Sequence, residues 1–210
     1  YLPMVYPKPF TKKKLSEDEL NTKNIYSCPQ TLFKIHPDFD QVIFNILEKD
    51  KKGIIYFIKD SNKVWYKKLI KRFSVNKKYD SKKIIFLDPL NYEDYLLHLG
   101  RASVLLDPLY YGAGNSFFES MLFGTPTVTF PTDHIKSRLV LGAYKQMEID
   151  YPPIATSIQN YVDLAVSYAN KDNISALKNI YKIAAEKKLF ETKKAGEEFN
   201  KIITDLFNLT

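Results

Sequence analysis

From Asn24 onward, short apolar runs alternate with longer segments whose apolar residues recur at helical spacing. An uninterrupted apolar run is typical of a buried strand, and apolar positions three and four apart are typical of a helix with one buried face. The pattern predicts strands at residues 25–28, 53–58, 84–87, 103–106 and 127–130, and helices at residues 38–49, 64–73, 91–100, 116–123, 135–147, 157–170, 174–183 and 193–207.

This alternation predicts a doubly wound α/β fold with a mostly parallel sheet, because continuous apolar strands joined by helices are typical of right-handed parallel crossovers. Residues 1–24 are proline-rich and then polar, with one helical turn near residues 15–20, and read as a linker from an upstream domain. Residues 25–190 are expected to form one α/β domain and residues 191–210 a C-terminal helix. Since the sequence begins at Tyr1 rather than Met, we expect a piece of a longer polypeptide.

The amino-acid composition is typical of a globular protein without a membrane helix. The 210 residues are 45% apolar and 26% charged, near globular averages, and no apolar stretch reaches the length of a membrane helix. Cys28 is the single cysteine, so an internal disulfide is excluded and a reducing, cytoplasmic location is expected. Three well-separated histidines and one cysteine show no metal-ligand spacing, and we expect no metal.

The charge balance favours a small anionic ligand over nucleic acid. The net charge is +7, but the lysines are dispersed, whereas a nucleic-acid binder concentrates positive charge on one face. A basic α/β domain that binds RNA nonspecifically is therefore a minor alternative. A mild positive field still attracts a nucleotide diphosphate.

The candidate chemistry lies at residues 105–120, where a strand ends, two glycines follow and a helix begins. Gly112 and Gly114 let the backbone approach a ligand closely or adopt positive φ, and Asn115 and Ser116 are residue types that cap helices. Backbone N–H groups and the helix dipole form an anion site there, at the strand ends where parallel sheets bind ligands. The alternative is a strand-to-helix turn that merely needs glycine.

Three motifs then point to a family. Residues 107–131 carry Gly-Asn-Ser, then Glu119, then Phe-Gly-Thr-Pro-Thr-Val-Thr. Residues 28–37 read Cys-Pro-Gln-Thr-Leu-Phe-Lys-Ile-His-Pro, and a Ser-Arg pair stands at residues 137–138. In this order the motifs closely resemble the carboxy-terminal catalytic region of the O-linked N-acetylglucosamine transferase and SPINDLY-like family. The resemblance implies the Rossmann-like C-terminal half of a GT-B glycosyltransferase fold.

The resemblance also implies a reaction: a UDP-sugar donor, usually UDP-N-acetylglucosamine, and a metal-free inverting transfer to a serine or threonine hydroxyl of a protein. Lys34 would neutralise charge on the diphosphate leaving group, which is catalytic because that charge grows in the transition state. Asn115 and Ser116 would hold the phosphates, and Gly112 and Gly114 would let them approach. The upstream domain would supply the acceptor surface and the proton-handling residues.

The remaining contacts implied by the resemblance concern the nucleoside. Glu119 would bind the ribose where the family often has aspartate. Thr31 falls where many members have glutamine, and Tyr92 and Tyr95 fall near a region that contacts uracil and often carries a histidine and a lysine. These departures leave open base recognition and the identity of the sugar. The sequence also leaves open a non-protein acceptor. Because it contains one α/β domain where a GT-B enzyme has two, a nucleotide-binding module without turnover of its own is the second hypothesis. Lys34 also has a plainer interpretation, as a surface lysine at the end of a strand.

Three other positions have more than one interpretation. His36 precedes Pro37 and is either a general base or an extended lead into the next helix. Arg138 orients a phosphate, orients the turn at residues 131–133, or forms an ion pair. Tyr110 and Tyr111 wall the sugar pocket or pack at a strand end. Trp65 is expected in the core.

Overall fold

The fold is built on one five-stranded sheet. The computed structural model describes residues 6–190 and 193–208. All pairings between its strands are parallel, and the strand order is β3-β2-β1-β4-β5. The strands are β1 (Ile25–Cys28), β2 (Ile54–Ile58), β3 (Ile84–Leu87), β4 (Val104–Leu106) and β5 (Thr127–Val128). The doubly wound α/β fold is confirmed.

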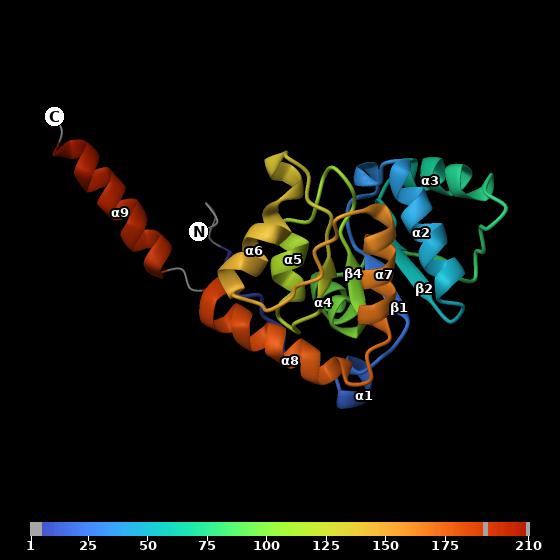
Figure 1. Cartoon of the computed structure of the whole chain (residues 1–210), viewed down its shortest axis with the longest axis horizontal. Coiled ribbons are helices and arrows are strands. Elements are labelled where there is room, and N and C mark those ends of the chain that lie inside the picture. Colours follow the sequence, from blue (N-terminus) through green and yellow to red (C-terminus); the bar gives the residue numbers. More distant parts are fainter. Residues whose placement is uncertain (1–5, 191–192, 209–210) are drawn as a thin grey trace.

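Helices connect and cover the strands (Figure 1). Among them, α2 and α7 pack against each other, and α4 packs against α5. The helices are α1 (Glu17–Leu20), η1 (Leu32–Lys34), α2 (Asp38–Lys49), α3 (Val64–Ser74), α4 (Tyr92–Arg101), α5 (Asn115–Ser120), η2 (Ile135–Ser137), α6 (Leu139–Met147), α7 (Ile158–Ala169), α8 (Ile174–Ala184), the π-helical η3 (Ala185–Leu189) and α9 (Lys193–Phe207).

The strand order creates a switch point beside β1. The chain moves from β1 outward through β2 to β3, then returns through α4 to place β4 on the other side of β1. The chain runs outward from β1 to β2 on one side and from β4 to β5 on the other. These opposite directions open a crevice at the carboxyl ends of β1 and β4, where open parallel sheets bind ligands. The turns that follow Cys28 and Leu106 therefore border one site.

The core explains why the apolar runs became strands. Tyr26 and Cys28 of β1 are fully buried, and the rings of Phe57 and Phe86 stack across β2 and β3 at 5.2 Å between centroids. On α2, Phe39 meets the edge of the Tyr161 ring at 5.9 Å. Ser27, whose side chain points to the opposite face from those of Tyr26 and Cys28, is also fully buried, so both faces of β1 are covered, as a parallel sheet requires.

Three predicted boundaries are wrong around the turns. The helix expected at residues 116–123 ends at Ser120, because the chain must turn to reach Gly124, which has φ of +72°. The strand expected at residues 127–130 has only its first two residues in the ladder. The helix expected at residues 135–147 is divided at Arg138 into η2 and α6.

The predicted core position of Trp65 is also wrong. Its side chain is 41% exposed and its ring lies 6.1 Å from that of Phe33. Trp65 stands one turn before Leu69 and two turns before Phe73, which are the buried residues of α3. Helical spacing therefore puts it on the buried face, but that face is covered only from Leu69 onward.

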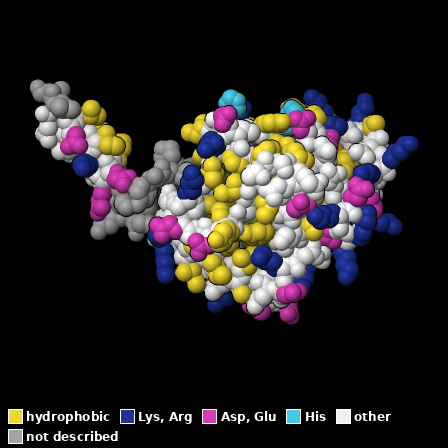
Figure 2. Space-filling model, in the orientation of Figure 1, with side chains coloured by type: hydrophobic (Ala, Val, Ile, Leu, Met, Phe, Trp, Pro, Cys, Tyr) yellow, Lys and Arg dark blue, Asp and Glu magenta, His cyan; other side chains and the backbone are white. Residues whose placement is uncertain are grey.

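One helix stands apart from the body of the domain. Helix α9 projects outward in Figure 1, and Figure 2 shows apolar side chains along it in open view. The same view shows Lys and Arg side chains spread around this face with acidic residues between them. None of the described helices is both long and apolar enough to cross a membrane.

Candidate functional site

A cleft of about 530 Å³ opens at the carboxyl ends of β1 and β4. Its walls come from the turn after β1, from α4, from the turn after β4 and from the start of α5. All the site residues predicted from the sequence line it, namely Lys34, Thr31, Tyr95, Gly112, Gly114, Asn115, Ser116 and Glu119. The structure therefore brings distant motifs together, while their roles in binding stay predictions.

Lys34 is a half-buried residue of η1, not a surface lysine at a strand end. Its Nζ donates to the carbonyl oxygen of Gly112 and to Oε1 of Gln30, both at 3.2 Å, and lies 4.3 Å from the centre of the Tyr111 ring. Burial lowers the pKa of Lys34, and the nearby carboxyl of Asp107 opposes that shift. The ammonium is thus held against the glycine turn.

The glycine turn differs in detail from the sequence expectation. Positive φ belongs to Tyr110, at 69°, and to neither Gly112 nor Gly114. Gly112 is needed for space, because a Cβ there would lie 2.9 Å from Oδ2 of Asp107. Gly114 is the N-cap of α5, without a side-chain cap.

Asn115 and Ser116 consequently do not cap α5. They are its first two residues, so their backbone N–H groups belong to the first helical turn. Asn115 is exposed toward the cleft, and Ser116 is buried with its Oγ accepting from Nε2 of Gln30. The start of the helix is therefore open to an anion, as its dipole favours.

Gln30 is not among the residues that the sequence predicts for the site. It is 6% exposed, donates to Ser116 and accepts from Lys34. Its amide thus links the candidate lysine to the first turn of α5. The sequence did point to it: many members of the resembled family have glutamine where this chain has Thr31, and Gln30 stands one residue earlier.

The buried carboxylate of Asp107 holds the glycine turn in place through hydrogen bonds. It is 2% exposed, and its carboxylate accepts from the backbone N–H of Ala113 and from Oγ1 of Thr129, the latter at 2.6 Å. Burial raises the pKa of Asp107 to about 6, and these hydrogen bonds and the Lys34 charge oppose the shift. The carboxylate that ends β4 therefore fixes the position of the glycine turn.

The side of the cleft toward α4 is lined by hydroxyl and carboxyl groups. Glu119 is 9% exposed and accepts a hydrogen bond of 2.9 Å from the hydroxyl of Tyr6. The rings of Tyr92 and Tyr95 on α4 stack at 6.5 Å, and burial raises the pKa of Tyr95. Beyond Thr31 a second hollow of about 220 Å³ continues past the ends of β2 and β3.

The structure decides between the interpretations of Tyr110, Tyr111, His36 and Arg138. Tyr111 lines the cleft, whereas the hydroxyl of Tyr110 donates to Asp38. His36 is exposed, accepts from the backbone N–H of Asp38 and is not among the residues lining the cleft. Arg138 donates to the carbonyl oxygen of Thr132 at 2.9 Å, so it orients the turn.

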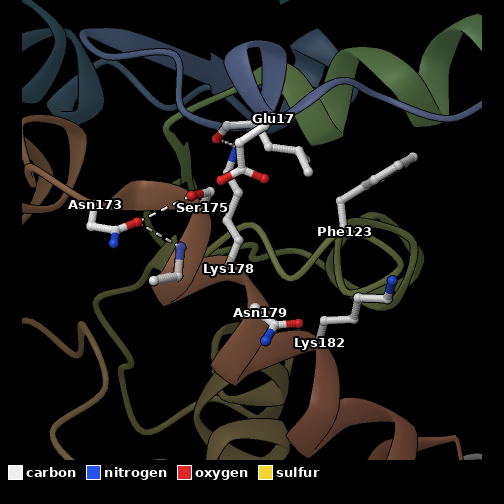
Figure 3. Close-up of a pocket in the computed structure, with 9 residues that line it drawn as sticks. Glu17, Phe123, Asn173, Ser175, Lys178, Asn179 and Lys182 are labelled. Atoms are coloured by element: carbon white, nitrogen blue, oxygen red, sulfur yellow. Dashed lines mark hydrogen bonds between the residues drawn. The ribbon is translucent and has the colours of Figure 1, made fainter.

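A separate pocket of about 360 Å³ lies between α1 and α8 (Figure 3). Lys178 reaches through it and donates to the carbonyl oxygens of Leu20, at 2.9 Å, and Gly100, at 2.6 Å. Leu20 is the last residue of α1 and Gly100 lies in the last turn of α4, so the buried ammonium satisfies carbonyl groups that a helix leaves unpaired. This pocket serves the packing of three helices.

A five-stranded parallel sheet covered by helices, with a glycine turn at its switch point, is the architecture of the Rossmann-like half of a GT-B glycosyltransferase. A sequence model of glycosyl transferase family 41 matches residues 12–199, and the chain belongs to that family. A search of curated protein sequences returned no significant match.

Solved structures of the same fold superpose on this chain. A mutant O-GlcNAc transferase of Thermobaculum terrenum superposes with a TM-score of 0.73 at 16% identity, over 98% of this chain and 37% of that one. S. aureus TarM, in complex with UDP, fondaparinux and α-GlcNAc-glycerol, gives 0.68 at 16% identity, over 94% and 38%. Anabaena HepE, in complex with UDP and glucose, gives 0.60 at 10% identity, over 91% and 53%. The chain thus spans about two fifths to half of these proteins.

Proposed function

We propose that the domain binds UDP-N-acetylglucosamine and is the donor half of an inverting, metal-independent transferase acting on serine or threonine hydroxyls of protein. Membership of family 41 supports it, as do relatives solved with UDP. The observation that carries it is Lys34, whose ammonium stands against the glycine turn at the start of α5.

The chemistry follows from where charge develops. The acceptor oxygen attacks the anomeric carbon, the bond from that carbon to the phosphate oxygen breaks, and the acceptor proton leaves to a base. Negative charge grows on the departing UDP. The Lys34 ammonium and the first N–H groups of α5 stabilise that charge more in the transition state than in the ground state.

The nucleoside would extend from the diphosphate toward α4. Glu119 would accept from the ribose hydroxyls, and the hollow beyond Thr31 and Tyr95 has room for the uracil ring. Selectivity for the sugar depends on side chains around the whole cleft. The acceptor surface and the proton-accepting base would come from an upstream domain of the same polypeptide.

A second candidate is a nucleotide-binding module that does not turn over by itself. The observation in its favour is coverage, since the chain spans 37% and 38% of the two highest-scoring structures described above. In either case a cytoplasmic location fits the single, buried, reduced cysteine.

Calorimetric titration with UDP and with UDP-N-acetylglucosamine tests the donor site. We expect saturable binding that Lys34→Ala weakens by about tenfold and Ser116→Ala by less, because hydrogen bonds to charged groups contribute most. Lys77→Ala is the matched control, since Lys77 is exposed and is not among the lining residues. Absence of UDP binding by the folded chain, or equal loss in the control, would refute the proposal.

A further inference from the structure

The segment before α1 is fastened along the nucleoside side of the cleft. Thr11 Oγ1 donates to Glu93 Oε1 at 2.9 Å, and the Lys13 ammonium donates to Asp94 Oδ1 at 2.9 Å. Glu93 and Asp94 form the first turn of α4, the same helix that presents Tyr95 to the cleft. The segment is therefore held at the wall where the nucleoside would lie.

Tyr6 makes the innermost contact of this segment. Its ring stacks on Phe118 at 5.0 Å between centroids, and its hydroxyl donates to Oε1 of Glu119. Burial, and then Glu119, raise the pKa of Tyr6, so the hydroxyl stays protonated and remains a donor. Tyr6 is thus bound both to the helix that carries Glu119 and to the carboxylate itself.

We infer that Tyr6 is a positioning residue of the donor site, which holds the Glu119 carboxylate in the orientation that accepts hydrogen bonds from a ribose diol. The inference rests on the proposed function, because it assumes that a uridine nucleotide occupies the cleft. It makes the segment around residues 6–13 a part of the site.

Two features favour positioning over competition for the carboxylate. A carboxylate has two oxygens with several lone pairs, and Tyr6 engages one of the oxygens. A free glutamate side chain loses substantial rotamer entropy when it is ordered. A hydrogen bond from Tyr6 orders Glu119 before the ligand arrives, which removes that cost from binding.

The test compares UDP with 2′,3′-dideoxyuridine diphosphate, which lacks both ribose hydroxyls, by calorimetry on the full chain. We expect the native protein to prefer UDP by about tenfold, the size of a charge-assisted hydrogen bond. Tyr6→Phe keeps the ring stack and removes the hydroxyl, so the preference should fall to about twofold, with dideoxy-UDP affinity unchanged. A merely structural role would weaken both nucleotides equally.

Tyr168→Phe is the matched control, since it removes a hydroxyl that donates to the Tyr151 carbonyl outside the residues lining the cleft. Glu119→Gln should likewise reduce the preference to about twofold or less, because it removes the charge that the ribose hydroxyls would meet. If UDP binds but the preference survives Tyr6→Phe, or UDP binds the variant more tightly, the inference is wrong and the donor site stands. If the native chain binds no UDP, the proposed function fails and the inference fails with it.

Discussion

Gly112 shows how one absent side chain determines the geometry of the site. A Cβ at this position would lie 2.9 and 3.0 Å from the two oxygens of Asp107. That carboxylate is buried and is held by Ala113 and Thr129, so it has little freedom to move away. The glycine therefore lets the turn lie directly on the strand-end carboxylate.

Gly112→Ala is expected to lower the free energy of unfolding by about 1–3 kcal/mol, the usual cost of forcing atoms into a filled site. Urea unfolding measures it. Gly196→Ala is the control, because no atom lies within 4 Å of a Cβ there and alanine favours a helix, so it should not destabilise. Equal stability of Gly112→Ala and the native chain would contradict a fixed Asp107.

Single residues show where sequence reasoning reached its limit. Lys34, Ser116 and Glu119 stand in motifs, so they were predictable, and the structure places them in one cleft. Tyr6 was not predictable, because its partner Glu119 is 113 residues away, and the sequence pointed to Gln30 only through its place beside Thr31, since its partner Ser116 is 86 residues away. Such contacts depend on tertiary packing, which local patterns do not contain.

At the scale of elements, Lys178 joins three helices. It lies on α8 and donates to carbonyl oxygens in the last turns of α1 and α4, those of Leu20 and Gly100. Its side chain is 1% exposed, and burial lowers the pKa of Lys178 to about 7. In the unfolded chain a lysine titrates near 10.4.

This difference predicts a pH dependence of stability. Between pH 7 and 10 the unfolded chain keeps a proton that folded Lys178 has released, so this residue makes the free energy of unfolding rise with pH, by at most about 1.4 kcal/mol per unit. Below pH 7 both states carry the proton, and the burial penalty is then fully present. Lys178→Met removes this rise.

Urea unfolding of the native chain and of Lys178→Met at pH 7, 8 and 9 measures the effect. The native chain should gain stability relative to the variant at each step. Lys182→Met, an exposed position on the same helix, is the control and should follow the native pH profile. Parallel profiles for the native chain and Lys178→Met would show that Lys178 keeps its ordinary titration.

Helices and strands were predictable where the spacing of their apolar residues is unambiguous. Residues 38–49 form α2 as expected, because their apolar side chains keep strict helical spacing and Asp50 ends the helix in extended conformation. The region after Ser120 was less predictable, since Gly124 approaches within contact of Lys178 on α8. Turn geometry there follows from packing against a helix some fifty residues later in the chain.

At the scale of the whole molecule, the parallel order of strands follows from alternation, but the place of β4 beside β1 does not. Apolar alternation predicts right-handed crossovers without saying on which side of the sheet the chain returns. The glycine turn at residues 110–114 is consistent with this placement, because ligand-binding turns in open parallel sheets lie where the strand order reverses. Helix α9 differs from the other helices, because its sequence pattern is amphipathic and yet its apolar side chains are exposed.

Helix α9 is expected to contribute little to the stability of the domain. Phe199, Ile202, Leu206 and Phe207 are each more than half exposed, so they remove little apolar surface from water. A chain ending at residue 190 should melt within about 2 °C of the native chain, since surface changes usually cost under about 0.5 kcal/mol. Its affinity for UDP should be unchanged, because no α9 residue lines the cleft.

Thermal melts followed by circular dichroism and UDP calorimetry on both chains check this. A chain ending at residue 173 is the control: it also loses α8, whose Lys178 and Tyr181 are buried in the body, and it should not fold stably. A fall of more than about 5 °C for the chain ending at residue 190 would correspond to about 1.3–2.5 kcal/mol and would mean that α9 folds back onto the domain in solution. An unchanged melt together with an unchanged affinity for UDP would show that residues up to 190 fold and bind the nucleotide without α9.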